Sequence, residues 1–327
     1  MEMQKNINFY YKPESFCREY VEIKKDSNQL IQFMAAALGI KKSYDDWFPL
    51  DKIDEIGGMC RQYKLNCKFD WIFVPQGDVS KVVSGGGRLP TTKMLGFPFK
   101  EKYKNIENAS VHVFFSKSKE NLKLSFKNGW YPLIIKNRAI HKPYIDILRF
   151  GYFLGYPNCC IDFFRQYNNH FLYNYLFEAL KNTKTEPHIY CNPLLKDHTF
   201  SYIYHMPCSY NCKATVSYAS TLRKELSKLE PELVQKTDEM LAKPFLVFKE
   251  QNTYTFEGEI KKNSIYYSDF AFIGNKVDNS SDAFSDIMRK GNRIEAGKNE
   301  ITVYHDNEKI AARQKNAGEG FIIQFKG

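Results

Sequence analysis

The sequence predicts an α+β protein in three parts. Apolar stripes of helical period dominate the middle of the chain, short strands surround a helix before it, and apolar and polar residues alternate after it. A length of 327 residues allows two or three domains. We therefore predict an α/β domain over residues 1–142, a helical domain over 143–244 and a small antiparallel β-domain over 245–327.

Residues 1 to about 50 are predicted to be helical, because the segment NQLIQFMAAALGI has an apolar stripe that stops at Gly39, a residue typical of helix ends. FDWIFVP and ASVHVFFS then have the composition of buried strands. KSKENLKLSFKNG predicts a helix that ends at Gly129, and WYPLIIK predicts a further strand. This strand–helix–strand order suggests a small α/β unit.

The middle part opens with a helix that begins near Pro143 and ends near Gly155. Asn158 is a suitable N-cap for a long aromatic-rich helix, CCIDFFRQYNNHFLYNYLFEAL. After an irregular connection, HMPCSYNC leads into another helix, for which Ser209 or Asn211 could supply the cap. Residues 245–327 alternate apolar and polar side chains between turn pairs and predict hairpins.

Composition and charge restrict the classes of partner and location. The formal net charge of +10 favours an anionic partner such as a nucleotide, another anionic small molecule or tRNA, although scattered lysines also suit a solvated surface. No apolar run approaches the ~20 residues of a membrane span, and the start lacks the pattern of a signal peptide. We therefore expect a cytoplasmic protein with no membrane partner, whose eight cysteines are not a disulfide framework.

Two cysteine segments stand out from the remaining sequence. Cys159 and Cys160 fall in the first turn of a predicted helix, and Cys208 and Cys212 lie at the start of another. The start of a helix has unpaired N–H groups and the positive end of the helix dipole, which lower the pKa of a nearby thiol. We predict that the two segments share one site. The alternative is that each cysteine is an ordinary buried side chain, the interpretation we prefer for Cys17, Cys60 and Cys67.

The spacing of the cysteines bears on which metal they could bind. Adjacent residues of a helix point in different directions, so we expect only one of Cys159 and Cys160 to bind, together with Cys208 and Cys212. Three thiolates suit a four-iron iron–sulfur cluster with one open iron, which we favour slightly. Zinc would need a fourth ligand, for which His205 is the candidate and Cys191 a weaker one.

The motifs GYPNCC and HMPCSYNC together resemble those of a prokaryotic family, a domain of unknown function with GYP-x-C-C and PCS-x-x-C elements. The resemblance covers roughly residues 145–230. It implies a shared site but no particular reaction. The residues that it singles out are Tyr156, Pro157, Cys159, Cys160, Pro207, Cys208, Ser209 and Cys212.

Other candidate site residues are less specific. Asp162 and Ser209 lie beside the cysteines and are the candidate catalytic residues, although a carboxylate in the first turn also complements the helix dipole. The stretch SGGGRLPTTK could hold an anion through Arg88 and Lys93, but it lacks the ending of a Walker motif and also suits a flexible turn.

Three functions remain open on the sequence alone. The first is a metalloenzyme whose iron–sulfur cluster acts on an anionic small molecule, nucleotide or tRNA at an open metal position. The second is a metal-free thiol enzyme with Cys159 or Cys160 as nucleophile. The third is an RNA-binding protein in which zinc only joins the helices.

Overall fold

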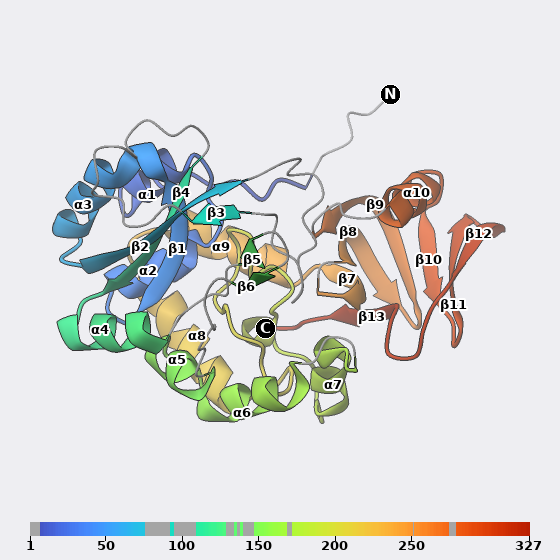
Figure 1. Ribbon diagram of the computed structural model, residues 1–327. Coiled ribbons are helices and arrows are strands. Elements are labelled where there is room, and N and C mark those ends of the chain that lie inside the picture. Colours follow the sequence, from blue (N-terminus) through green and yellow to red (C-terminus); the bar gives the residue numbers. More distant parts are fainter. Residues whose placement is uncertain are drawn as a thin grey trace.

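The computed structural model describes residues 7–75, 92–94, 109–128, 134–135, 138–139, 147–168, 172–250, 252–274 and 279–327. Helices and a four-stranded sheet form the first part, helices form the middle, and a seven-stranded antiparallel sheet forms the last part (Figure 1). The predicted α+β fold class is therefore confirmed.

The first part packs helices against a mixed-length antiparallel sheet of order β1-β4-β2-β3. Its helices are α1 (Arg18–Lys24), α2 (Leu30–Ala37), a short 3-10 helix (Leu50–Lys52), α3 (Ile53–Gln62) and α4 (Lys119–Asn128). Its strands are β1 (Tyr44–Pro49), β2 (Asn66–Pro75), β3 (Thr92–Met94) and β4 (Ser110–Ser116), with the separate pair β5 (Ile134–Ile135) and β6 (Arg138–Ala139).

The prediction that residues up to about 50 are helical is wrong for β1. Its residues alternate in burial, with Tyr44, Asp46 and Phe48 buried, as a strand with one covered face requires. Tyr44 pairs with Phe115 of β4 at one end of the register. Pairing with a strand far along the chain decides the conformation, and a local pattern does not contain that information.

The middle part is helical, and its first helices follow the lower edge of the molecule in Figure 1. Its helices are α5 (Ile147–Phe153), α6 (Asn158–Tyr167), α7 (Tyr175–Lys181), a 3-10 turn (Ile189–Cys191), α8 (Lys213–Leu226) and α9 (Pro231–Leu241). The single long helix predicted after Asn158 is wrong, because α6 and α7 are separate. Asn174, directly before α7, instead donates side-chain hydrogen bonds of 2.8 Å to the carbonyls of Phe248 and Gly318.

The last part is a sheet of order β12-β11-β10-β9-β8-β7-β13, in which the neighbouring strands are antiparallel. The strands are β7 (Pro244–Lys249), β8 (Asn252–Lys261), β9 (Ser264–Ile273), β10 (Arg293–Ala296), β11 (Glu300–His305), β12 (Glu308–Gln314) and β13 (Phe321–Gln324). Helix α10 (Asn279–Met288), which the sequence analysis did not predict, packs Phe284 and Met288 against one face of this sheet.

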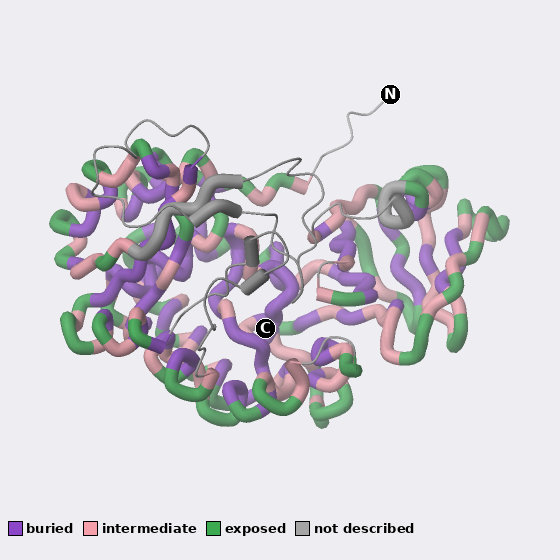
Figure 2. The backbone as a smooth tube through the Cα atoms, in the orientation of Figure 1, coloured by how far each residue is buried: buried purple, intermediate pink, exposed green. Residues whose placement is uncertain are grey.

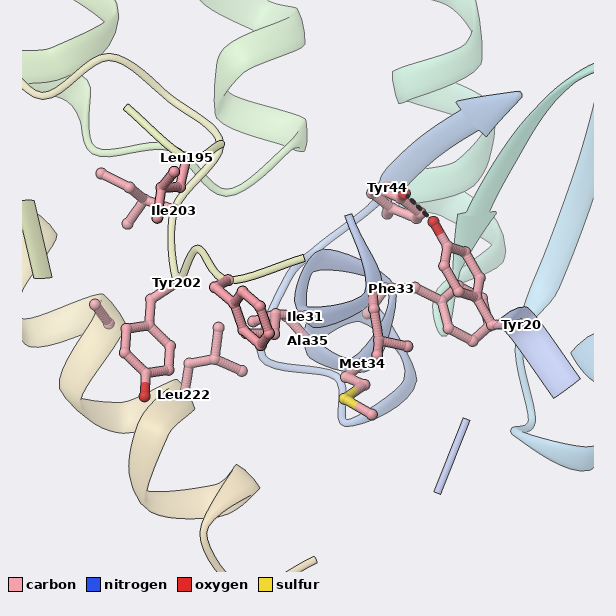
Figure 3. Close-up of a cluster of buried hydrophobic side chains, with 14 of the residues drawn as sticks. Tyr20, Ile31, Phe33, Met34, Ala35, Tyr44, Leu195, Tyr202, Ile203 and Leu222 are labelled. Atoms are coloured by element: carbon pink, nitrogen blue, oxygen red, sulfur yellow. Dashed lines mark hydrogen bonds between the residues drawn. The ribbon is translucent and has the colours of Figure 1, made fainter. Parts of the chain in front are cut away.

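One cluster of buried side chains includes residues from all three parts of the chain. Every residue of α2 is buried, so this helix is covered on all sides (Figure 2). In Figure 3, Phe33 of α2 lies toward Tyr20 and Tyr44, whereas Ile31 lies on the side of Tyr202. α2 therefore links the first sheet to the irregular segment that leads to the second cysteine motif.

In the part of the chain that the structure describes, every helix is too short or too polar to cross a lipid bilayer.

Candidate metal centre

Four cysteine sulfurs from two distant segments form one compact group. The Sγ atoms of Cys159, Cys160, Cys208 and Cys212 all lie within 4.8 Å of one another. Cys212 Sγ lies 3.6 Å from that of Cys159 and 3.7 Å from that of Cys160, and the adjacent pair is 3.9 Å apart. The predicted meeting of the two cysteine segments is thus observed, and the group is close enough to hold a metal ion.

The first segment owes its geometry to the turn before α6. Gly155 has φ +81°, a conformation that L side chains rarely adopt, and it reverses the chain after α5. Pro157, and not the predicted Asn158, is the N-cap residue, and its carbonyl accepts hydrogen bonds of 3.0 Å from the N–H groups of Cys160 and Ile161. The adjacent cysteines therefore occupy the first turn of α6, as predicted.

The second segment is a tight turn that ends at α8. The Ser209 carbonyl accepts a 3.2 Å hydrogen bond from the N–H of Cys212. Cys212 is itself the N-cap residue of α8, where Ser209 or Asn211 was predicted, and its carbonyl accepts from Val216 N–H at 2.9 Å. The N–H of Cys208 points at Cys160 Sγ, 3.4 Å away, so a backbone hydrogen bond joins the two segments.

Both members of the adjacent pair belong to the group of sulfurs, whereas only one of them was expected to bind. Successive side chains of a helix diverge by about 100°, which motivated that expectation. At the start of the helix, however, both sulfurs lie close to Cys212 Sγ, at 3.6 Å and 3.7 Å, and the three sulfurs form a nearly equilateral triangle. Cys159 is exposed and Cys160 is buried, so the group lies near the protein surface.

The pKa values of the thiols in this group are shifted in opposite directions. Hydrogen bonds from the thiols of Cys160 and Cys208 hold the pKa of Cys212 well below its usual range, and Thr215 adds to this effect. Hydrogen bonds with Cys208 and then with Cys212, together with burial, raise the pKa of Cys160. Cys212 is therefore the thiol of this group that loses its proton most readily.

His205 lies behind the sulfurs. Its Nε2 is 2.9 Å from the hydroxyl of Thr215, and that hydroxyl is 3.4 Å from Cys160 Sγ. His205 does not belong to the set of ligand atoms that lie within 4.8 Å of one another. Burial, and then the charge of Lys41, lower the pKa of His205 to about 3, which keeps the ring neutral. Thr215 was missed by the sequence analysis, although its position three residues after Cys212, in the first turn of α8, was a usable signal.

The other site residues proposed from the sequence are not part of the group of four sulfurs. Asp162 is on the exposed side of α6, where it pairs with Arg165 at 3.4 Å. Cys191 is buried beside the group, but its thiol donates to the Cys212 carbonyl at 3.6 Å. Arg88 lies outside the described residues, and Lys93 is in β3, opposite Val74 in the register.

The comparisons with known proteins add no relative to this description. No family model matches the chain, no curated protein matches it, and no solved structure matches it. The resemblance to the family with GYP-x-C-C and PCS-x-x-C elements therefore stays a prediction, and the site is interpreted from its own geometry.

Proposed function

We propose that this chain is a metalloprotein in which the sulfurs of Cys159, Cys160, Cys208 and Cys212 bind one metal ion, zinc being the first candidate. The observation that carries the proposal is the set of sulfur–sulfur distances among Cys159, Cys160 and Cys212, which range from 3.6 to 3.9 Å, with Cys208 Sγ within 4.8 Å of each. Ligands about 2.3 Å from a tetrahedral zinc ion lie about 3.8 Å from one another. The three distances among Cys159, Cys160 and Cys212 therefore match those expected around a single tetrahedral ion.

The same distances favour one ion over the four-iron cluster. In such a cluster each cysteine binds a different iron, so its sulfurs lie further apart than sulfurs that share one ion. A group with all four sulfurs within 4.8 Å would have to open to accept it. Four thiolates also complete the coordination of zinc, so neither His205 nor Cys191 is needed as a ligand.

The positions of the four cysteines in the chain suggest that a bound ion would stabilise the fold. The four ligands come from the first turn of α6, the turn that follows Pro207, and the residue before α8. Metal binding would join these segments at one point and stabilise the folded chain, because the unfolded chain has no such preformed site. The exposed Cys159 leaves one side of the centre accessible to solvent.

Elemental analysis of protein purified without oxygen tests this proposal directly. We expect about one zinc per chain and neither iron nor acid-labile sulfide. Replacement by Co²⁺ should give the absorption of a tetrahedral tetrathiolate site, and X-ray absorption should give sulfur neighbours at about 2.3 Å. Iron with an equal amount of sulfide would overturn the single-ion proposal in favour of a cluster.

A second candidate is thiol chemistry without metal. It is favoured by the lowered pKa of Cys212 and by the exposed Cys159, whose sulfur is only 3.6 Å away. Oxidation by a small disulfide would transfer both electrons of the two thiols to that disulfide and leave a bond between Cys159 and Cys212. Metal-free protein as isolated, with a reversible disulfide at this pair in peptide mass spectrometry, would select this candidate over zinc.

A further inference from the structure

The four cysteines of the proposed centre differ in how far their surroundings enclose them. Cys160 and Cys212 are buried, with exposed fractions of 1 % and 6 %, Cys208 is partly buried, and Cys159 is exposed. The contact between the sulfurs of Cys160 and Cys212 is buried, whereas the contacts of Cys159 Sγ with these two sulfurs are only partly buried. Cys159 is therefore the member of the group that a dissolved reagent reaches most easily.

The sulfurs also differ in the hydrogen-bond donors around them. Cys160 Sγ accepts a hydrogen bond from Cys208 N–H at 3.4 Å and lies 3.4 Å from the hydroxyl of Thr215. Thr215 also forms hydrogen bonds with Cys212. In the part of the chain that the structure describes, the hydrogen-bond contacts of Cys159 Sγ are with sulfurs alone. Because a donated hydrogen bond withdraws electron density from a metal-bound thiolate, Cys159 retains more of that density than Cys160 or Cys212.

A zinc ion bound by four thiolates has nucleophilic sulfur ligands. The thiolates carry more negative charge than Zn²⁺ neutralises, and coordination keeps each sulfur deprotonated without a general base. Such a sulfur can attack a carbon that bears a leaving group. A bond forms between the carbon and the sulfur, the bond between the carbon and the leaving group breaks, and its electron pair departs with the leaving group. The step needs no oxidant, no reductant and no proton transfer.

From the exposure and the hydrogen bonding of the sulfurs we propose that Cys159, as a zinc ligand, accepts the alkyl group of small electrophiles with an unhindered primary carbon, such as alkyl sulfonates. This inference rests on the zinc centre proposed above. The product is a thioether, which is a neutral and weaker zinc ligand than a thiolate, and the reaction occurs once per chain. Alkylation would therefore lower the zinc affinity of the chain and weaken the link between the starts of α6 and α8.

Reaction of the full chain with methyl methanesulfonate tests the proposal, with the zinc content measured in the same sample. At about pH 6.5 free thiols are mostly protonated, so peptide mass spectrometry should find one added methyl group, on Cys159. We expect this site to react about tenfold or more faster than any cysteine outside the group. Removal of zinc with a chelator should slow methylation of Cys159 by about tenfold or more, since a metal-free thiol must first lose its proton.

Two variants serve as controls. Cys159→Ser removes the proposed acceptor, so the rapid methylation should disappear. Cys67→Ser removes a partly buried cysteine outside the group and should leave the rate at Cys159 unchanged. If Cys159→Ser does not fold, the peptide map of the wild type still identifies the residue that reacts.

Each contrary outcome shows which of the two proposals fails. If the protein contains zinc but is not methylated, or is methylated mainly at Cys160, Cys208 or Cys212 or equally at all cysteines, Cys159 is not the acceptor, although the zinc centre stands. Faster methylation of Cys159 after zinc removal would show that zinc protects this sulfur, and an unchanged zinc affinity after methylation would show that it is not a ligand. Protein that contains no zinc as isolated would overturn the zinc centre, and with it this inference.

Discussion

The sulfurs of Cys159 and Cys212 lie 3.6 Å apart, although 53 positions separate the two residues in the chain. Cys159 is the second residue of α6, and Cys212 directly precedes α8. Both sulfurs are therefore close to the electropositive start of a helix, which stabilises thiolates and hence metal ligation. The four sulfurs come together only when the starts of α6 and α8 meet. Metal binding at this centre therefore requires that the middle part of the chain be correctly packed.

Serine substitutions should distinguish three of the four proposed ligands from the buried Cys191 beside them. Cys160→Ser, Cys208→Ser or Cys212→Ser should each abolish stoichiometric zinc and lower the thermal midpoint, because a closed tetrahedral site loses one ligand. Cys191→Ser is the matched control, since Cys191 is buried beside the group but donates to a carbonyl. It should keep its zinc. Zinc loss in Cys191→Ser alone would contradict the assigned ligand set.

Thr215→Val should weaken the centre without removing a ligand. The hydroxyl of Thr215 lies between His205 Nε2, at 2.9 Å, and Cys160 Sγ, at 3.4 Å. Valine keeps the shape but leaves both groups without this partner, so we expect zinc affinity to fall about tenfold in a competition assay with a chelator. Thr237→Val is the control, because Thr237 is also buried in a helix but its hydroxyl donates to the Leu233 carbonyl. Equal affinities in the two variants would show that Thr215 has no influence on the metal.

The sequence predicted the site better than it predicted the elements around it. Cysteines at two helix starts were enough to expect one centre, because capping preferences and helix dipoles are local properties. Inclusion of both Cys159 and Cys160 was not predictable in this way. It depends on Cys212 lying close to both sulfurs, which is a contact across 52 or 53 positions.

The wrong predictions of secondary structure have the same physical cause. β1 is a strand because Tyr44 and its neighbours pair with β4, more than sixty residues away. Helix α6 ends at Tyr167, and the Asn174 side chain bonds to carbonyls of the last part of the chain. Both outcomes are set by long-range contacts that outweigh local propensity. Strands β8 and β9 were predictable because apolar and polar residues alternate in their sequence, although burial does not alternate regularly along either strand.

The buried Lys41 should make stability depend on pH. Burial lowers the pKa of its amine to about 7, although Gln32 accepts a 3.0 Å hydrogen bond from it and tyrosine rings surround it. Between about pH 7 and the ordinary lysine pKa near 10.4, the unfolded chain binds a proton that the folded chain does not. The free energy of unfolding therefore rises with pH in this window. Below about pH 7 the amine is charged in both the folded and the unfolded chain, so its burial lowers stability by an amount that does not change with pH.

The measurement is urea unfolding of the wild type and Lys41→Met at pH 7 and pH 9.5. The free energy of unfolding of the wild type should rise relative to that of the variant by on the order of 2–3 kcal/mol. Loss of the hydrogen bond to Gln32 lowers the stability of the variant equally at both pH values, so it does not affect this difference. A difference that stays constant with pH would show that the amine remains charged in the folded protein.

Gly151→Ala should disturb the packing that presents Cys159 and Cys160. A Cβ at Gly151 would lie 2.9 Å from Cγ1 of Ile161, which is closer than side-chain carbons approach one another. Since Gly151 is in α5 and Ile161 is in α6, the added methyl group should push the two helices apart. We expect a loss of about 1–3 kcal/mol in the free energy of unfolding and a lower zinc affinity.

Gly57→Ala is the matched control for this substitution. Gly57 also lies within a helix, α3, but its added Cβ would meet nothing closer than a guanidinium nitrogen of Arg61 at 3.7 Å. This variant should gain about 0.5–1 kcal/mol, because alanine favours the helix over the unfolded chain. In Gly151→Ala combined with Ile161→Ala, the second substitution removes the clashing atoms, so the double variant should lose less stability than the sum of the single variants. Additive losses would show that the contact between Gly151 and Ile161 does not set the distance between α5 and α6.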